Sequence, residues 1–174
     1  MTTEKLLKKL ERPAGKVDVV LDTDTYNEID DQFALAYLIR SDEKLNLKAV
    51  YAAPFFNHHS VSPGDGMEKS YQEIHKILSL MGKEELKEIT YKGSGRFLPG
   101  EKEAVDSPAA HDLIRRARER DEENPLYVIA IGAITNIASA ILLEPSIIDK
   151  IVVVWLGGNS LDWHDNREFN AYQD

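Results

Sequence analysis

Residues 17–40 read VDVVLDTDTYNEIDDQFALAYLIR, and this stretch decides the fold. Val17–Asp22 is a short β-branched run that ends in an acid, which is typical of a buried strand. Asp31–Arg40 carries apolar residues at helical spacing, so we expect a helix there. A strand that passes through a loop into a helix is the first half of a parallel β-α-β unit.

The same alternation of strand and helix patterns continues along the chain. Further strands are expected at Leu45–Ala53, Glu88–Tyr91, Leu126–Ile131 and Ile151–Leu156. Further helices are expected at Met67–Met81, Ser107–Glu123 and Ile134–Leu143, with a short helical turn at Pro145–Asp149. This order predicts an α/β fold, with an open, mostly parallel sheet covered by helices on both faces. Ligands of such sheets bind at the carboxyl ends of the strands, so the loops there should share one rim.

The composition indicates one globular domain and excludes several classes of protein. The 174 residues are 43% hydrophobic and contain no evident linker or repeat, so they predict a single domain over residues 1–174. The chain has no cysteine, which excludes disulfides, thiolate zinc sites and cysteine nucleophiles. Its net charge of −9 has the wrong sign for binding nucleic acid or an anionic membrane surface, and suits a protein that binds cations.

Two segments bear on the location of the protein. Residues 1–11 alternate charges with leucines and lack the apolar run of a signal peptide, so we expect a cytoplasmic protein that begins with a short amphipathic helix. Residues 124–143 carry no formal charge and match the length of a membrane span. Because Gly132 divides them into a strand-like and a helix-like half, we interpret them as a buried strand and helix and expect no membrane association.

The loop after the first strand concentrates acidic side chains. Five carboxylates lie within residues 22–31 without a lysine or arginine, namely Asp22, Asp24, Glu28, Asp30 and Asp31. Two unit charges about 4 Å apart repel by roughly 4 kcal/mol at an effective dielectric constant of about 20, so converging carboxylates need a cation. Ca²⁺ or Mg²⁺ would satisfy oxygen ligands of this kind. The alternative is that Asp30 and Asp31 only stabilise a helix N-terminus, while Glu28 is solvated.

Three known motifs compete for this loop. An EF-hand would need glycine at its sixth position and glutamate at its twelfth, where the chain has Asn27 and Phe33. Val19–Thr25 is similar to the strand and Asp-x-Asp-x-Thr motif of haloacid dehalogenase-type phosphatases. The loop also resembles the Asp-x-Asp-x-Gly-x-Asp-Asp motif of nucleoside hydrolases, with two residues inserted within Thr25–Ile29. The loop alone leaves both of these resemblances open.

The second half of the chain distinguishes them. Ile131–Ala138, Pro145, Ile151–Gly158 and Glu168–Asn170 resemble, in order and spacing, the later motifs of nucleoside hydrolases. A dehalogenase-type phosphatase needs a second acidic strand end, for which the chain offers no convincing candidate. The chain is therefore similar to the inosine-uridine-preferring nucleoside hydrolase superfamily. That resemblance implies hydrolysis of the N-glycosidic bond of a ribonucleoside, the small-molecule partner, to free base and ribose by a metal-activated water.

The resemblance also implies roles for individual residues. Asp22 and Asp31 match the calcium-binding aspartates of the family, and the backbone carbonyl of Ile131 matches a further ligand. Ca²⁺ is therefore expected rather than Mg²⁺, and Asp22 also matches the general base. The side chains that match residues holding the ribose are Asp30, Asn57, Glu168 and Asn170. From the turn chemistry alone, Thr135 and Asn136 are expected to fix the start of their helix by capping bonds.

The length of the family implies that this chain corresponds to the N-terminal part of a longer domain, because its members are considerably longer. Residues 157–174 are polar and predict no closing helix or strand. Two alternatives to the hydrolase are a Mg²⁺-dependent dehalogenase-type phosphohydrolase with Asp22 as nucleophile, and a catalytically inactive fragment that binds ribose or metal. Apolar surface exposed on such a partial domain would favour a homo-oligomer.

Overall fold

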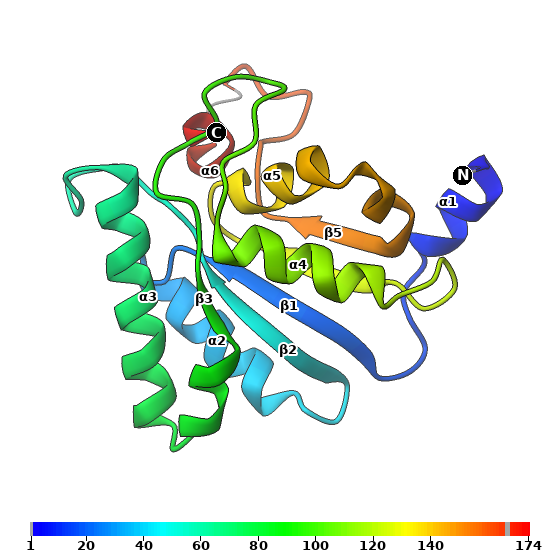
Figure 1. Ribbon diagram of the computed structural model, residues 1–174, viewed down its shortest axis with the longest axis horizontal. Helices are drawn as coiled ribbons and strands as arrows, with labels where there is room; N and C mark the ends of the chain where they lie inside the picture. Colours follow the sequence, from blue (N-terminus) through cyan, green and yellow to red (C-terminus); the bar gives the residue numbers. More distant parts are fainter. Residues whose placement is uncertain (1, 166–167) are drawn as a thin grey trace.

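The structure is a computed structural model that describes residues 2–165 and 168–174. Its centre is one sheet of five parallel strands in the order β3-β2-β1-β4-β5 (Figure 1). The strands are β1 (Val17–Thr23), β2 (Leu45–Ala52), β3 (Thr90–Lys92), β4 (Leu126–Ala130) and β5 (Ile151–Trp155). The expected α/β fold with a parallel sheet is therefore confirmed, and the acidic loop follows the central strand.

Helices connect the strands much as the apolar spacing predicts. The helices are α1 (Thr3–Lys9), α2 (Ile29–Arg40), α3 (Pro63–Leu80), α4 (Pro108–Arg118), α5 (Thr135–Leu143) and α6 (Phe169–Gln173), with 3₁₀ helices η1 (Glu84–Ile89) and η2 (Pro145–Lys150). Helix α4 ends before the expected Glu123. The Asp121 carboxylate accepts hydrogen bonds from the backbone N–H groups of Glu123 and Asn124, which fixes a turn there instead.

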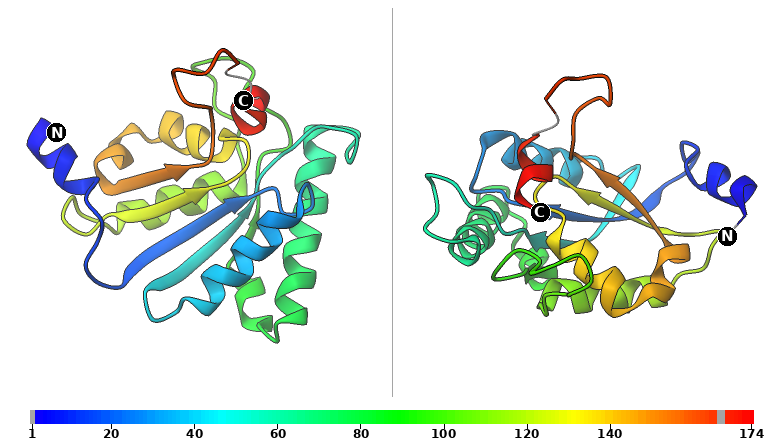
Figure 2. Two further views of the ribbon diagram at one scale, coloured as in Figure 1. Left: turned by 180° about the vertical axis from the view of Figure 1, so that it is seen from behind. Right: turned by 90° about the horizontal axis from the view of Figure 1, so that it is seen from above.

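The sheet separates two apolar cores. Because successive side chains of a strand point to opposite faces, Val19 and Leu21 contact one core while Val20 contacts the other. Helices α2 and α3 cover the first face, and α4 and α5 cover the second. Figure 2 shows α2 and α4 on opposite sides of the sheet in its right-hand view. Burial on both faces of this central strand explains why Val19–Leu21 is an uninterrupted apolar run rather than an alternating one.

The C-terminal segment contains a helix, so the expectation of no closing element was wrong. Helix α6 lies at the carboxyl ends of the strands (Figure 1). Its Gln173 side chain accepts a hydrogen bond from the backbone N–H of Phe56, at 2.6 Å. The Asp174 carboxylate accepts bonds from the Thr135 hydroxyl and, at 3.0 Å, from the N–H of Leu98. These contacts with loops far away in the sequence hold the short helix in place.

Residues 124–143 fold as β4 and α5, as expected from the glycine between them. Within β4, Leu126, Val128 and Ala130 are buried, while Tyr127 and Ile129 are half-buried. Among the described residues, no helix combines the length and apolar character needed to cross a membrane.

Candidate active site

Asp22 is buried one residue before the end of β1 and carries an unsatisfied polar atom. Its Oδ1 accepts a hydrogen bond of 2.8 Å from Nδ2 of Asn136. Its Oδ2 is buried, and the described part of the chain supplies no hydrogen-bond partner for it. Burial, reinforced by the nearby charge of Asp31, raises the pKa of Asp22 to about 7. A buried carboxylate oxygen without a donor is costly, so this atom is a candidate to bind a ligand.

Asp24 and Asp31 complete a buried acidic cluster. Both side chains are buried, and burial together with neighbouring carboxylates raises the pKa of each. Asp24 accepts a hydrogen bond of 3.1 Å from Nδ2 of Asn27, and Asp31 accepts one from the Thr23 hydroxyl. Glu28 and Asp30 are exposed instead. Three of the five acids in the loop are therefore buried, and Asp31 is not only a helix-end charge.

Asn136 belongs to this cluster, and the expectation that it caps a helix was wrong. Its Nδ2 donates to Asp22 and, at 3.3 Å, to the carbonyl of Ala52. Its Oδ1 accepts from the backbone N–H and the hydroxyl of Ser94, at 2.7 and 2.9 Å. Thr135 likewise bonds Asp174 rather than its own turn. The side chain of Asn136 thus ties together β1, β2 and the loop after β3.

Only glycine fits at position 93 beside this network. A Cβ atom there would lie 2.1 Å from the carbonyl oxygen of Ala52 and 2.4 Å from Nδ2 of Asn136. Both distances are far below van der Waals contact. The close approach of the Gly93 backbone is therefore a condition for the hydrogen bonds of Asn136.

The carbonyl of Ile131, a predicted metal ligand, already has one partner. Asn170 donates from Nδ2 to this oxygen at 3.1 Å and to the carbonyl of Leu156 at 2.9 Å. The N–H of Ile131 donates to the carbonyl of Asp22 at 2.9 Å, which carries the parallel pairing of β1 and β4 beyond the strands. Asn170 is buried and bridges the ends of β4 and β5. A carbonyl oxygen has two lone pairs, so Ile131 retains one for a further ligand.

Glu168 acts as the N-cap of α6. Its carboxylate oxygens accept hydrogen bonds from the backbone N–H groups of Asn170, Ala171 and Gly158, at 2.9 to 3.0 Å. Burial opposes ionisation, but these backbone donors lower the pKa of Glu168 overall. Glu168 is therefore held as a carboxylate that orients the helix carrying Asn170.

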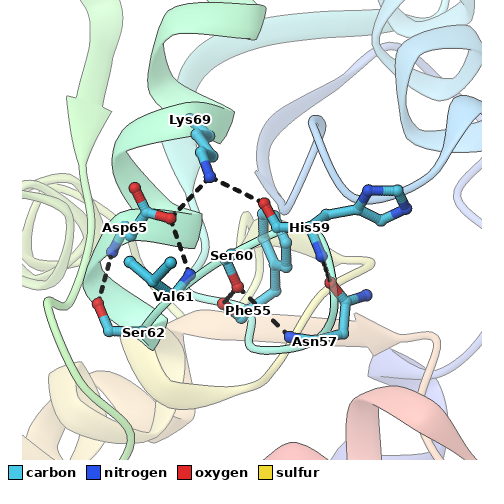
Figure 3. Close-up of polar contacts among 8 residues, drawn as sticks. All are labelled: Phe55, Asn57, His59, Ser60, Val61, Ser62, Asp65 and Lys69. Atoms are coloured by element: carbon cyan, nitrogen blue, oxygen red, sulfur yellow. Dashed lines mark hydrogen bonds and ion pairs between the residues drawn. The ribbon is translucent and has the colours of Figure 1, made fainter.

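The loop that carries Asn57 is braced against α3 (Figure 3). Oδ1 of Asn57 accepts a hydrogen bond of 2.8 Å from the backbone N–H of His59, and its own N–H donates to the Ser60 hydroxyl at 3.3 Å. Lys69 donates to the carbonyl of His59 at 2.9 Å and to Asp65 at 2.7 Å. Nδ2 of Asn57 donates at 2.6 Å to Oδ1 of Asn27, which joins this loop to the acidic loop.

The predicted site residues therefore form two linked groups and one separate residue. The first group contains Asp22 near the end of β1, Asp31 on the first turn of α2 and Asn57 in the loop after β2. The second contains Ile131, Glu168 and Asn170, which hydrogen bonds join at the ends of β4 and β5. Asp30 is exposed on the first turn of α2. Within residues 2–165 and 168–174, no three His, Cys, Asp or Glu side chains form a group that could hold a metal ion by themselves.

Comparison with known proteins identifies the family. The family model described as inosine-uridine preferring nucleoside hydrolase matches residues 19–174. This chain belongs to that family. No curated protein matches the chain significantly. The family match favours the nucleoside hydrolase interpretation of the acidic loop over the phosphatase interpretation of Val19–Thr25.

Solved structures share the fold of this chain at low sequence identity. The inosine-uridine preferring nucleoside hydrolase of Bacillus anthracis is 19% identical with a TM-score of 0.60, over 91% of this chain and 58% of that one. The purine-preferring ribonucleoside hydrolase of Gardnerella vaginalis is 21% identical with a TM-score of 0.56, over 82% and 49%. The type III effector protein XopQ, solved with adenosine diphosphate ribose, is 15% identical with a TM-score of 0.65, over 100% and 55%. The chain spans about half the length of these relatives.

Proposed function

We propose that this chain carries part of an active site that hydrolyses the N-glycosidic bond of ribonucleosides to free base and ribose. The observation that carries the proposal is the buried Oδ2 of Asp22, which has no hydrogen-bond partner within the described chain. Asp22 lies near the carboxyl end of the central strand β1, at the rim where α/β sheets bind ligands. The family match supplies the reaction class.

A calcium ion fits the chemistry of the cluster. Asp22, Asp31 and the carbonyl of Ile131 are hard oxygen donors of the type that Ca²⁺ prefers. Burial and neighbouring carboxylates raise the pKa values of Asp22 and Asp31, and the acidic loop contains no lysine or arginine to offset their charge. Among the described residues, no three His, Cys, Asp or Glu side chains are grouped so that they could hold a metal ion. The ligand set would therefore be completed by carbonyl groups, water or further residues. Bound calcium would offset the carboxylate charge and make a nearby water easier to deprotonate.

Asp22 is the proposed general base. Burial raises the pKa of Asp22 to about 7 in the metal-free protein, and a bound cation would favour the ionised carboxylate, so Asp22 would be able to accept a proton near neutral pH. Asn136 holds Oδ1 of Asp22 by its amide, so the proton from the attacking water would be taken by Oδ2. The Asp22 carboxylate would therefore accept the proton of the water without first changing its conformation.

The remaining residues would bind the sugar and stabilise charge. Cleavage of the glycosidic bond develops positive charge on the ribose, which the carboxylates of Asp24 and Asp31 would stabilise. The proposed ribose-binding side chains are Asp30, Asn57, Glu168 and Asn170. The hydroxyl groups of ribose both donate and accept hydrogen bonds, so carboxylate and amide side chains suit them.

The test is release of free base from inosine and from uridine in the presence of Ca²⁺, measured by chromatography. We expect turnover that is lost in Asp22→Asn and on addition of a chelator. Asp18→Asn is the matched control, because Asp18 lies on the same strand at its opposite end, where it pairs with Asn46 and Arg120. Calcium and ribose binding without turnover would instead support an inactive binding fragment. Phosphate release from p-nitrophenyl phosphate with a phosphorylated Asp22 would contradict the proposal.

A further inference from the structure

Asn27 lies in the inserted part of the acidic loop, within Thr25–Ile29, and the sequence patterns assign it no role. It is nevertheless buried, with 7% of its surface exposed. Its backbone N–H donates to the carbonyl of Asp24 at 2.7 Å, which closes a tight turn. A buried asparagine in a turn needs partners for its side-chain amide as well, and Asn27 finds both of them at the candidate active site.

The two ends of the Asn27 amide contact different loops. Nδ2 donates to the Asp24 carboxylate at 3.1 Å, and Oδ1 accepts from Nδ2 of Asn57 at 2.6 Å. Asn57 in turn accepts from the backbone N–H of His59 with its Oδ1. The result is one directed chain of hydrogen bonds that runs from His59 through both asparagines to Asp24.

The His59 end of this chain determines its direction. A backbone N–H can only donate, so Oδ1 of Asn57 accepts from His59 and Nδ2 of Asn57 faces Oδ1 of Asn27. If the amide of Asn57 were reversed, its NH₂ group would face the N–H of His59 and its oxygen would face the oxygen of Asn27. The backbone of His59 is itself held by Lys69, which donates to its carbonyl at 2.9 Å (Figure 3). The orientation of the Asn57 amide therefore depends on Asn27 on one side and His59 on the other.

We propose that Asn27 is a positioning residue that fixes the amide of Asn57 for binding the sugar. With one N–H given to Asn27 and one lone pair given to His59, Asn57 keeps one donor and one acceptor for a ligand. That pair matches a sugar hydroxyl, which accepts one hydrogen bond and donates another. The effect on nucleoside binding rests on the proposed function, whereas the positioning of Asn57 does not.

The kinetic test is a double-mutant cycle with inosine as substrate. Asn27→Ala is expected to raise the KM for inosine about fivefold, the effect of losing one well-placed hydrogen bond, with kcat changed less than about twofold. In an Asn57→Ala background the same change should have no further effect on KM, because Asn27 acts through Asn57. Asn46→Ala is the matched control, since Asn46 makes a similar bond of 2.5 Å to Asp18 at the opposite ends of the strands. If the KM increase in the double variant equals the product of the increases in Asn27→Ala and Asn57→Ala, the two residues act independently, and the proposal is overturned.

A second measurement does not depend on turnover. The side-chain amide signals of Asn57 in ¹H–¹⁵N spectra should shift toward solvent-exposed values and exchange faster in Asn27→Ala, but not in Asn46→Ala. Asn27→Ser, which keeps a small polar side chain, replaces the alanine variant if circular dichroism shows that the latter does not fold. Unchanged Asn57 signals would contradict the positioning role. If the wild-type protein releases no base while the Asn57 signals shift as expected in Asn27→Ala, the proposed function alone is refuted.

Discussion

Asn136 and Asp22 are 114 positions apart in the sequence and are joined by a hydrogen bond of 2.8 Å from Nδ2 to Oδ1. This bond satisfies one oxygen of a buried carboxylate, while the other has no hydrogen-bond partner among the described residues. It also links the start of α5 to the central strand β1, and Asn136 further donates to the carbonyl of Ala52 at the end of β2. The state of Asp22 therefore depends on a residue from the other half of the chain.

Asn136→Ala should destabilise the protein and weaken calcium binding together. The variant leaves a second Asp22 oxygen without a donor, which costs about 1–3 kcal/mol for a buried polar group. Thermal unfolding with and without Ca²⁺ measures both effects. Asn124→Ala, at an exposed turn, is the surface control. A variant as stable as wild type and equally stabilised by calcium would contradict the role of this bond.

Gly93→Ala should be destabilising through a steric clash. Its Cβ would lie 2.1 Å from the carbonyl oxygen of Ala52, so the backbone or Asn136 must move, and overpacking of this kind costs about 1–3 kcal/mol. Gly95→Ala is a close control, because no described atom lies within 4 Å of its Cβ position. Equal denaturation midpoints for the two variants would show that the approach at Gly93 is not tight.

The stability of the metal-free protein should depend on pH because of Asp22. The folded protein holds the Asp22 proton up to about pH 7, whereas the unfolded chain loses it in the ordinary carboxyl range. Between the ordinary carboxyl range and about pH 7, the folded state therefore binds more protons than the unfolded chain. The Asp22 carboxyl thus lowers the free energy of unfolding as pH rises through this interval, and it causes no further loss above about pH 7. His75, whose pKa is lowered by burial, acts in the opposite sense.

Comparing wild type with Asp22→Asn isolates the contribution of Asp22, because both proteins share His75. Urea unfolding in a chelator should show the stability of wild type falling relative to the variant between pH 5 and 7, by at most about 1.4 kcal/mol per pH unit. Added calcium should reduce this fall, since a cation favours the ionised carboxylate. If the free energy of unfolding of wild type instead rises relative to that of Asp22→Asn as the pH increases, the raised pKa of a buried Asp22 is contradicted.

The exposed apolar side chains of β5 should promote self-association. Val154 is 53% exposed and Leu156, just after the strand, is 56% exposed on the same face of the sheet. Val154→Lys should lower the fraction of dimer or larger species in sedimentation experiments. Val61→Lys is the control, because Val61 is a single exposed apolar residue in the loop before α3. A monomeric wild-type protein at high concentration would contradict this prediction.

The regular part of the fold was predictable because its signals are local. The β-branched run of β1 and the helical spacing of α2 each depend on neighbours within a few residues. Helix α6 was not predictable in this way, since five residues are too few to show a period and its stability comes from Gln173 and Asp174. The 3₁₀ helix η1 was missed for the same reason, and its end was interpreted as strand.

The candidate site was predictable only in part. The concentration of acids after β1 indicated Asp22 and Asp31, because charge without compensation is visible in the sequence. The partners of those acids were not visible, since the bonds of Asn136 and Asn57 connect loops far apart in the chain. Asparagine is common in turns, so a turn was the expected role for Asn136, and only its contacts distinguish the two roles. Asn27 had no predicted role, and only its contacts with Asp24 and Asn57 indicate one.

The central claim is that Asp22 acts as the base of a nucleoside hydrolase, and one comparison tests it most directly. The initial rate of base release from inosine with Ca²⁺ is measured for wild type, Asp22→Asn and Asp18→Asn at equal protein concentration. We predict release by wild type and Asp18→Asn, and a loss of at least about a hundredfold in Asp22→Asn, the scale of general base catalysis. Equal rates for wild type and Asp22→Asn would contradict the claim.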